Sequence, residues 1–480
     1  MAENRKMAFH DCSQLDTAKR PSGKYELLFG LEDRPPLLKM LLYGAQWALL
    51  FLPMITVSAG VVSSYLGFGP AEETAFLGRI LLISGGIMVL QTLFGHRLPL
   101  LDGPSSVIML VLIALAPLGL ASISGGFICG GILTALLGFL GLFRYIKNLF
   151  TDLVVGVITS LIALSLIPFM LPLILGRSSG HPHGDPSVLL VSALIMATMI
   201  LFTYRLKTIH RTYSFLWAIV LGAALMMAIG KFSLPDTASQ TWFRFPRPFW
   251  GPKPELDAVS IATFMIAYLA VVANEVGSIY SIAEVVGNEN LESKLHRGIG
   301  FTGLGGAVSG VVPTLGTVSY ALSPGVVFAT RVGSRFALTA CGGIVLVAAL
   351  CEKLNAFLAA IPLPVVGAAL MVAMGSQLMV GMSIVFRKKG ELSSRDYYVA
   401  GVPLILGTAA SILPQPFLDL LPLWLRVMVG NGMVVGIVSV LLLEHVLLRN
   451  GKEHRRTEGE IPVKTGTAGN KTDKDQNSKV

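Results

Sequence analysis

The residues best suited to bind a polar solute are an acid and a proline-headed segment, both set in apolar sequence. Glu275 lies beside Asn274 in an apolar run, where an ionisable side chain is costly and function is the default explanation. Further along, Ser323 is predicted to cap a helix whose first position is Pro324, because proline has no N–H to leave unpaired. The alternative for Glu275 is a structural acid bonded to backbone or to Asn274.

The helix that begins at Pro324 is too short to cross a bilayer. A span needs roughly 20 apolar residues, and Arg331 and Arg335 arrive before that length is reached. A helix that starts partway across a membrane points its unpaired N–H groups and the positive end of its dipole into the protein. We therefore expect this helix to face Glu275 across a transport site, where the acid could also carry a coupling proton.

A similar segment occurs earlier, where Gly103-Pro104 precedes the apolar run 107–118. Pro104 lies 66 residues after residue 38, and Pro324 lies 66 residues after residue 258. Broken hydrophobic segments at matching places in two halves are a good pointer to a transporter's binding site. The alternative, that each proline kinks a full-length helix, explains the matched pair less well.

Polar residues around the two segments complete the candidate site. Asp102 either contacts the substrate or caps the helix after Gly103-Pro104. Gln46 is expected to brace the site. The candidate hydroxyl contacts, each of which could instead be a small packing residue between helices, are Ser105, Ser106, Ser278 and Ser323.

The composition indicates a polytopic membrane protein. Of 480 residues, 53% are hydrophobic and 14% charged, against about 25% charged in soluble domains. The net charge of +9 arises from basic clusters in alternate loops, which places both termini in the cytoplasm rather than indicating nucleic-acid binding. Four cysteines without a paired spacing predict neither a disulfide framework nor a metal site. No nucleophile–base pair is visible, so neither an enzyme nor a cofactor is predicted.

Apolar runs predict about fourteen helical spans, seven in each half, in an all-α fold. Seven spans per half would insert the halves with opposite orientation, as inverted repeats. The predicted regions are an N-terminal arm (1–37), a first repeat (38–232), an extracytoplasmic connector (233–257), a second repeat (258–448) and a disordered cytoplasmic tail (449–480). The spans are placed near 38–66, 75–94, 107–118, 122–143, 150–175, 187–204, 213–230, 258–284, 298–316, 324–337, 338–359, 363–386, 397–414 and 422–448.

Several of these motifs resemble those of the nucleobase–ascorbate transporters, the xanthine/uracil permeases. Gln46-Trp47 is similar to the first-span motif, and Leu98-Pro99 through Ser106 to the third-span segment. Asn274-Glu275-Val276-Gly277-Ser278 resembles the acidic eighth-span motif. The run from Ser323 through Gly325 to Thr330-Arg331 matches the tenth-span signature in its spacing. The similarity covers residues 39–385.

The resemblance implies a fold of seven plus seven inverted repeats. A core domain would hold the substrate between short strands and half-helices of the third and tenth spans, and a gate domain would form a homodimer. Glu275 would hydrogen-bond a purine or pyrimidine base, with backbone N–H groups near Ser106 and Ala321. The implied activity is proton symport by alternating access, in the plasma or bacterial inner membrane.

The chain also departs from the family pattern. Leu322 stands where an acid or amide is usual, and Ser323 replaces the signature Asn. Thr302 takes the place of an Asp, and Trp47 that of a His. Leu322, Ser323, Gly325 and Trp47 are still expected at the substrate site. The coupling ion, proton or sodium, and the base itself are left open.

Three functions fit these patterns. The first is a proton-coupled nucleobase importer. The second is a sulfate- or carboxylate-type anion transporter on the same fold, favoured by two half-helix N-termini and opposed by Glu275. The third is a channel, or a sensor that binds a base without transporting it.

Overall fold

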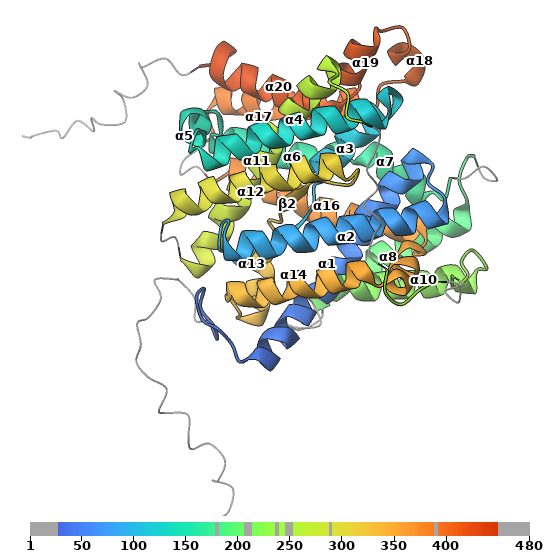
Figure 1. The fold of residues 1–480 in the computed structure, drawn as a ribbon. Helices are drawn as coiled ribbons and strands as arrows, with labels where there is room; N and C mark the ends of the chain where they lie inside the picture. The colour runs from blue at the N-terminus through green and yellow to red at the C-terminus, as the bar shows by residue number, and fades with distance from the viewer. Residues whose placement is uncertain are drawn as a thin grey trace, which may run out of the picture.

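The computed structural model describes residues 27–449 except 178–181, 206–213, 236–239, 245–252, 288–289 and 388–391. Most of the predicted arm and tail, and parts of the connector, lie outside these residues. The described chain is mostly helical (Figure 1).

Among its described residues, the first half contains eight longer helices. These are α1 (Leu37–Leu66), α2 (Pro70–Leu93), α3 (Ser106–Leu115), α4 (Gly119–Phe139), α6 (Asp152–Ser165), α7 (Ile167–Ile174), α8 (Pro186–Arg205) and α10 (Ser214–Ala228). Short turns are η1 (Ala116–Leu118), α5 (Phe143–Ile146) and η2 (Lys147–Leu149).

The second half repeats this order. Its helices are α11 (Ala258–Val286), α12 (Leu291–Val311), α13 (Ser323–Thr330), α14 (Arg335–Leu350), α15 (Glu352–Ala359), α16 (Leu363–Val385), α17 (Ser394–Ser411), α19 (Leu423–Val429) and α20 (Gly432–Leu442). Shorter pieces are α18 (Gln415–Leu418) and η3 (Leu443–Leu447).

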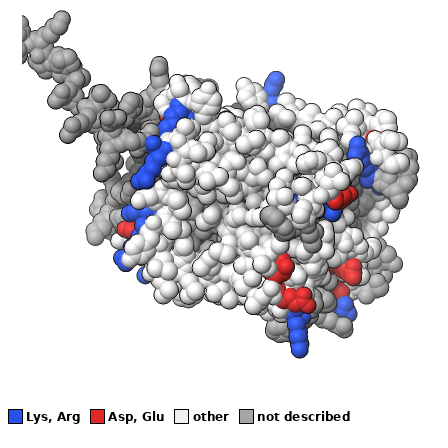
Figure 2. Space-filling model, turned by 90° about the horizontal axis from the view of Figure 1, so that it is seen from above, with Lys and Arg blue, Asp and Glu red and all other residues white. Residues whose placement is uncertain are grey.

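Within the described residues, seven helical stretches are long and apolar enough to cross a membrane, or eight if the bent pair α14–α15 is one span. Large apolar side chains such as Ile405, 71% exposed, cover the outer surface. On the face in Figure 2, Lys and Arg gather along one edge and a broad uncharged band covers the middle. The predicted membrane class is confirmed. The count of about fourteen spans, which includes short and broken ones, stays a prediction.

Several predicted span limits need correction. The predicted segment 324–337 is two elements: α13 ends at Thr330, Arg331 adopts a left-handed φ of 57°, and α14 begins at Arg335. The last predicted span, 422–448, is broken between α19 and α20 at Gly430 and Asn431. Asn431 explains that restart, because its side chain accepts from the backbone N–H groups of Met433 and Val434.

Each short half-helix follows a short strand, as the resemblance implied. β1 (Asp102–Pro104) precedes α3, and β2 (Thr317–Ser319) precedes α13. The strands pair antiparallel, with Asp102 opposite Ser319. Pro104 lies in β1 rather than in the helix, where its missing N–H removes one ladder donor. This pairing joins the two broken segments in the interior of the protein.

Helix contacts in one half have counterparts in the other. α2 packs on α14 as α12 packs on α4, and α8 packs on α10 as α17 packs on α20. The backbones approach closely at glycines: a Cβ on Gly138 of α4 would lie 2.2 Å from the backbone nitrogen of Gly300 on α12. Small residues allow this contact in membranes, where dispersion and close packing drive helix association. The many glycines thus serve packing.

The loops form two groups at opposite ends of the helices. At one end, Phe143 contacts His296 with ring centroids 6.2 Å apart, and Arg335 pairs with Glu32 at 2.8 Å. At the other end, Arg244 pairs with Glu352 at 2.7 Å. The predicted basic loops and the connector are therefore separated along the helix axes, as a membrane protein requires.

Candidate functional site

Two faces of α11 lie in different surroundings. Asn274 and Ser278, four residues apart, share one face and line a cavity of about 270 Å³ together with Ala321, which follows β2. At roughly 30 Å³ per molecule the cavity would hold about nine waters, the size range of one small planar heterocycle. Its other walls come from α6 and α16 and their ends, with the polar residues Asp152, Thr159, Ser383 and Arg387.

Glu275, one position further along α11, does not line this cavity. Its carboxylate is fully buried and accepts two hydrogen bonds from Ser319, one from the backbone N–H at 3.0 Å and one from the hydroxyl at 2.9 Å. A Cβ on Gly298 of α12 would lie 3.2 Å from Glu275 Oε1, so a glycine makes room for the acid. In this structure, Asn274 takes the place at the cavity that the sequence suggested for Glu275.

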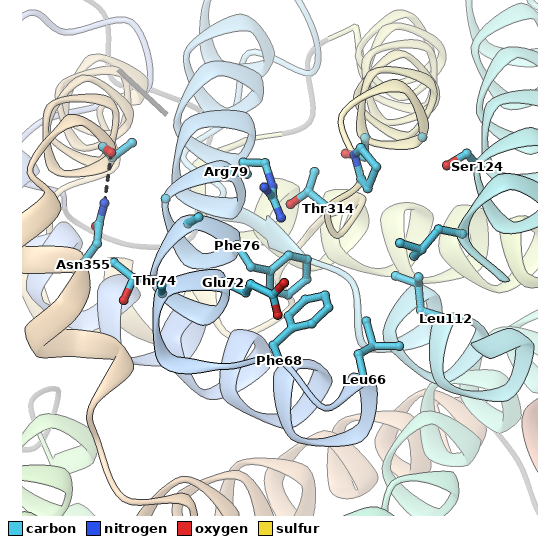
Figure 3. Close-up of a pocket in the computed structure, with 18 of the residues that line it drawn as sticks. Leu66, Phe68, Glu72, Thr74, Phe76, Arg79, Leu112, Ser124, Thr314 and Asn355 are labelled. Carbon is cyan, nitrogen blue, oxygen red and sulfur yellow. Dashed lines mark hydrogen bonds between the residues drawn. The ribbon is translucent and has the colours of Figure 1, made fainter. Parts of the chain in front are cut away.

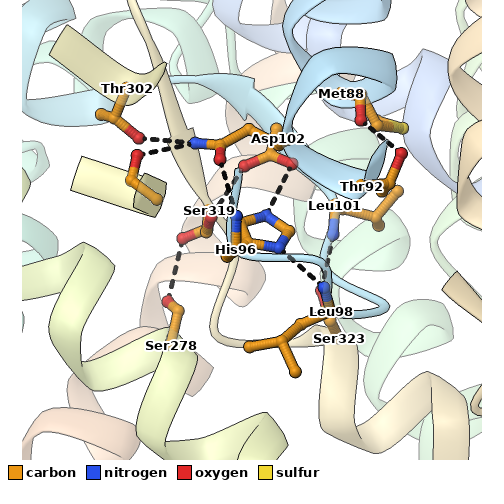
Figure 4. Close-up of polar contacts among 12 residues, drawn as sticks. Met88, Thr92, His96, Leu98, Leu101, Asp102, Ser278, Thr302, Ser319 and Ser323 are labelled. Carbon is orange, nitrogen blue, oxygen red and sulfur yellow. Dashed lines mark hydrogen bonds and ion pairs between the residues drawn. The ribbon is translucent and has the colours of Figure 1, made fainter. Parts of the chain in front are cut away.

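Asp102 is equally buried and belongs to the same polar group (Figure 4). Its Oδ1 accepts from the Ser319 hydroxyl at 2.7 Å, and its Oδ2 lies 3.2 Å from His96 Nε2. Asp102 therefore neither caps a helix nor lines the cavity. His96, Asp102 and Glu275 each place a possible ligand atom within 4.8 Å of the others, although their sequence spacing shows no metal motif.

The position of His96 is fixed by its own backbone and its neighbours. Its Nδ1 accepts the backbone N–H of Leu98 at 3.0 Å, and its own N–H donates to Gln91 Oε1 at 3.3 Å. Gln91 is held in turn by Gly298 and Thr302 of α12, each at 3.0 Å. Thr302, which departs from the family pattern, thus helps to position His96 by holding Gln91.

Ser319 joins the buried acids to the cavity. Its N–H and hydroxyl face Glu275 and Asp102, while its carbonyl accepts from Asn274 Nδ2 at 3.3 Å and Ser278 Oγ at 2.9 Å. Sequence reasoning missed both Ser319 and His96. The available signal was the spacing of Thr317-Val318-Ser319 before the tenth-span signature, because alternate residues of a strand share a face.

The prediction that Ser323 caps its helix is wrong. α13 begins at Ser323, and no side chain caps it. The Ser323 hydroxyl instead accepts the backbone N–H of Leu101 at 3.0 Å and donates to the Tyr320 carbonyl at 2.9 Å. Pro324 is therefore the second residue of the helix rather than the first, although it does lie in the first turn. In the other segment, Ser105 is the cap, with its hydroxyl accepting from Ile108 N–H at 3.4 Å.

The remaining predicted site residues do not line this cavity. Ser106 is the first residue of α3 and is half-buried. Leu322 is half-buried, and a Cβ on Gly325 would meet no atom within 4 Å. On α1, Gln46 is half-buried, and Trp47 is buried with no hydrogen-bond partner for its indole nitrogen. Of the predicted contacts, only Ser278 and Ala321 line the cavity.

A larger cavity of about 660 Å³ lies at the opposite loop end (Figure 3). Its apolar wall includes Phe68, Phe76, Leu112 and Phe127, and Arg244 and Glu352 stand at its connector side. It contains none of the predicted site residues. The smaller cavity beside β2 is therefore the candidate substrate site.

Comparison with solved structures identifies the fold. The transmembrane domain of the cyanobacterium bicarbonate transporter BicA matches with a TM-score of 0.58 at 16% identity, covering 85% of this chain and 99% of that one. The murine SLC26A9 anion transporter in its inward-facing state matches with a TM-score of 0.56 at 13% identity, over 85% and 69%. The chain has the fold of these multi-pass membrane transporters.

Sequence comparison then gives the family. Residues 38–415 match the family model Xan_ur_permease, described as a permease family, and the chain belongs to it. Uric acid permease PucJ of Bacillus subtilis is 27% identical, covering 82% of this chain and 89% of that protein. Uric acid transporter UacT of Escherichia coli is 25% identical, over 87% of both. Xanthine permease XanP of E. coli is 26% identical, over 87% and 94%.

Proposed function

We propose that this permease imports an oxidised purine base of the uric acid or xanthine class. The observation that carries the proposal is the polar cavity at Asn274, Ser278 and Ala321, set against the paired strands of the two broken segments. The names of the relatives point to the same substrate class.

The cavity chemistry suits a lactam edge, the N–H beside C=O that oxidised purines carry. A side-chain amide can accept from such an N–H and donate to such a C=O at once. Asn274 donates one N–H to the Ser319 carbonyl, which leaves its Oδ1 and its second N–H to bind a base. Ser278 and the backbone at Ala321 would bind a second edge.

Transport follows from alternating access between two groups of helices. One group contains α1–α4 and α11–α15, and the other contains α6, α7, α8, α10 and α16–α20. The cavity lies where α11 of the first meets α6 and α16 of the second, so a rocking motion between inverted repeats would open it to either side. We assign these groups to core and gate, with homodimerisation through the gate and cytoplasmic termini.

Glu275 remains the proposed proton-coupling residue, acting from behind the cavity through Ser319. In this role it would be a positioning residue rather than a direct base contact. Asp102 would act alongside it.

Uptake by the purified full chain in proteoliposomes tests the function. Radiolabelled uric acid, xanthine, uracil and sulfate are compared with and without an inward proton gradient. We expect accumulation of uric acid or xanthine, stimulated by the gradient. Accumulation of sulfate alone would establish the anion alternative, and binding of a base without uptake would establish the sensor.

A further inference from the structure

The Ser319 hydroxyl has too few hydrogens for its two short contacts if the buried acids Asp102 and Glu275 are both ionised. The hydroxyl oxygen lies 2.7 Å from Asp102 Oδ1 and 2.9 Å from Glu275 Oε1. A serine hydroxyl has one hydrogen and can donate to only one of them. The second short contact requires a hydrogen on the carboxyl oxygen. Two bare carboxylates at this spacing would also repel strongly, because both are buried.

The neighbouring groups cannot supply the missing hydrogen. His96 Nδ1 accepts the Leu98 N–H, so the ring is neutral and carries its hydrogen on Nε2, which donates to Asp102 Oδ2. Glu275 Oε2 accepts the Ser319 N–H. Each acid thus has one oxygen occupied as an acceptor, and its other oxygen faces the Ser319 hydroxyl.

Other elements packed around the acids bring no compensating charge among the described residues. The Tyr320 hydroxyl donates to the Pro104 carbonyl at 3.0 Å. α12 presents Gly298 and Thr302, and the Gln91 amide from α2 bonds to both of them. The titratable side chains facing the acids are therefore His96 and Tyr320.

We propose that Asp102 and Glu275 share a single proton through the Ser319 hydroxyl. In one arrangement Glu275 Oε1 holds the proton and donates to Ser319, whose own hydrogen goes to Asp102. In the other, Glu275 Oε1–H passes its proton to Oγ while the Oγ–H proton passes to Asp102 Oδ1. Charge and atoms balance, and the pair carries one negative charge in both arrangements.

The shared proton deepens the proposed transport function, and its role in coupling rests on that function. Ser319 presents its carbonyl to the cavity residues Asn274 and Ser278 and its hydroxyl to the acids. A base that draws Asn274 or Ser278 away from this carbonyl would shift β2 and alter both acid contacts. Release of the proton would then accompany release of the base on the same side of the membrane.

Infrared spectroscopy of the purified full chain in lipid counts the proton without any substrate. A protonated carboxyl gives a C=O stretching band that shifts on exchange into D₂O. We expect D102N and E275Q each to abolish the same band, because either amide can donate to Ser319 and leave the remaining acid ionised. The matched control is E352Q, which alters a carboxylate of α15 that pairs with Arg244 outside the group and should leave that band in place.

The outcomes separate the shared proton from other states. Partial loss in each variant would show two separately protonated acids, and absence of the band in the wild type would show two ionised acids. Either outcome overturns the proposal. If one variant fails to fold, the other variant and a pH titration of the wild-type band together still show whether the two acids share one proton.

Uptake by the same variants tests the coupling role separately. We expect D102N to lose stimulation by the proton gradient. If the infrared band behaves as expected but no base enters the proteoliposomes, the shared proton is supported and the proposed transport function is wrong. If the bases enter with full stimulation in D102N, the pair has no part in coupling.

Discussion

The two broken segments are similar in sequence, but their residues make different contacts. β1–α3 contributes Asp102, a buried acid tied to His96, and its helix is closed by the Ser105 cap. β2 contributes Ser319, whose carbonyl accepts from the cavity residue Ser278, and Ala321 between β2 and α13 lines the cavity itself. The helix α13 has no side-chain cap. The pairing of Asp102 with Ser319 joins the two roles. Matched backbones therefore permit one segment to hold a buried acid while the other borders the cavity proposed for the substrate.

The largest expected effect is on the β2 side. Asn274→Ala removes the amide that would pair with a lactam edge, leaving two polar groups of the base unmet at roughly 1–3 kcal/mol each. We expect at least about a 30-fold loss of base affinity, measured by calorimetric titration. Folding should persist, because Ser278 still bonds to the Ser319 carbonyl.

The matched control lies on the β1 side. Ser106→Ala changes the first residue of α3, which does not line the cavity. Affinity close to wild type is expected. An equal loss in both variants would place the base between the two segments, and the comparison drawn above would fail.

A smaller effect is expected from filling the cavity. Ala321→Leu adds three carbons beside Asn274 and Ser278. Overpacking costs about 1–3 kcal/mol, so base affinity should fall about 5- to 140-fold. Gly343→Ala on α14, where a Cβ would meet nothing within 4 Å, serves as the control. Unchanged affinity in Ala321→Leu would move the substrate site elsewhere.

The smallest effects are on stability and compare the two serines. Ser323→Ala leaves the buried Leu101 N–H without its acceptor, at a cost of about 1–3 kcal/mol. Ser105→Ala removes a helix cap, which costs about 0.5–2 kcal/mol. Unfolding of the purified protein in detergent measures both. A greater loss of stability in Ser105→Ala than in Ser323→Ala would contradict the roles assigned to the two serines.

Much of the fold could be predicted because it depends on local pattern. Long apolar runs, the prolines at 104 and 324 and the spacing of basic loops follow from bilayer thickness and backbone chemistry. The site was harder to predict. The sequence predicts that Ser323 caps a helix. Its hydroxyl instead accepts the backbone N–H of Leu101, more than 200 residues away in the chain.

The sequence by itself determined that this chain crosses a membrane, contains two truncated helices beside a buried acid, and resembles the permeases. Only the tertiary structure decided which side of α11 faces the cavity, because neighbouring helical residues point about 100° apart. It also gathered His96, Asp102, Glu275 and Ser319 into one group. Those contacts join four separate segments, and no local pattern encodes them.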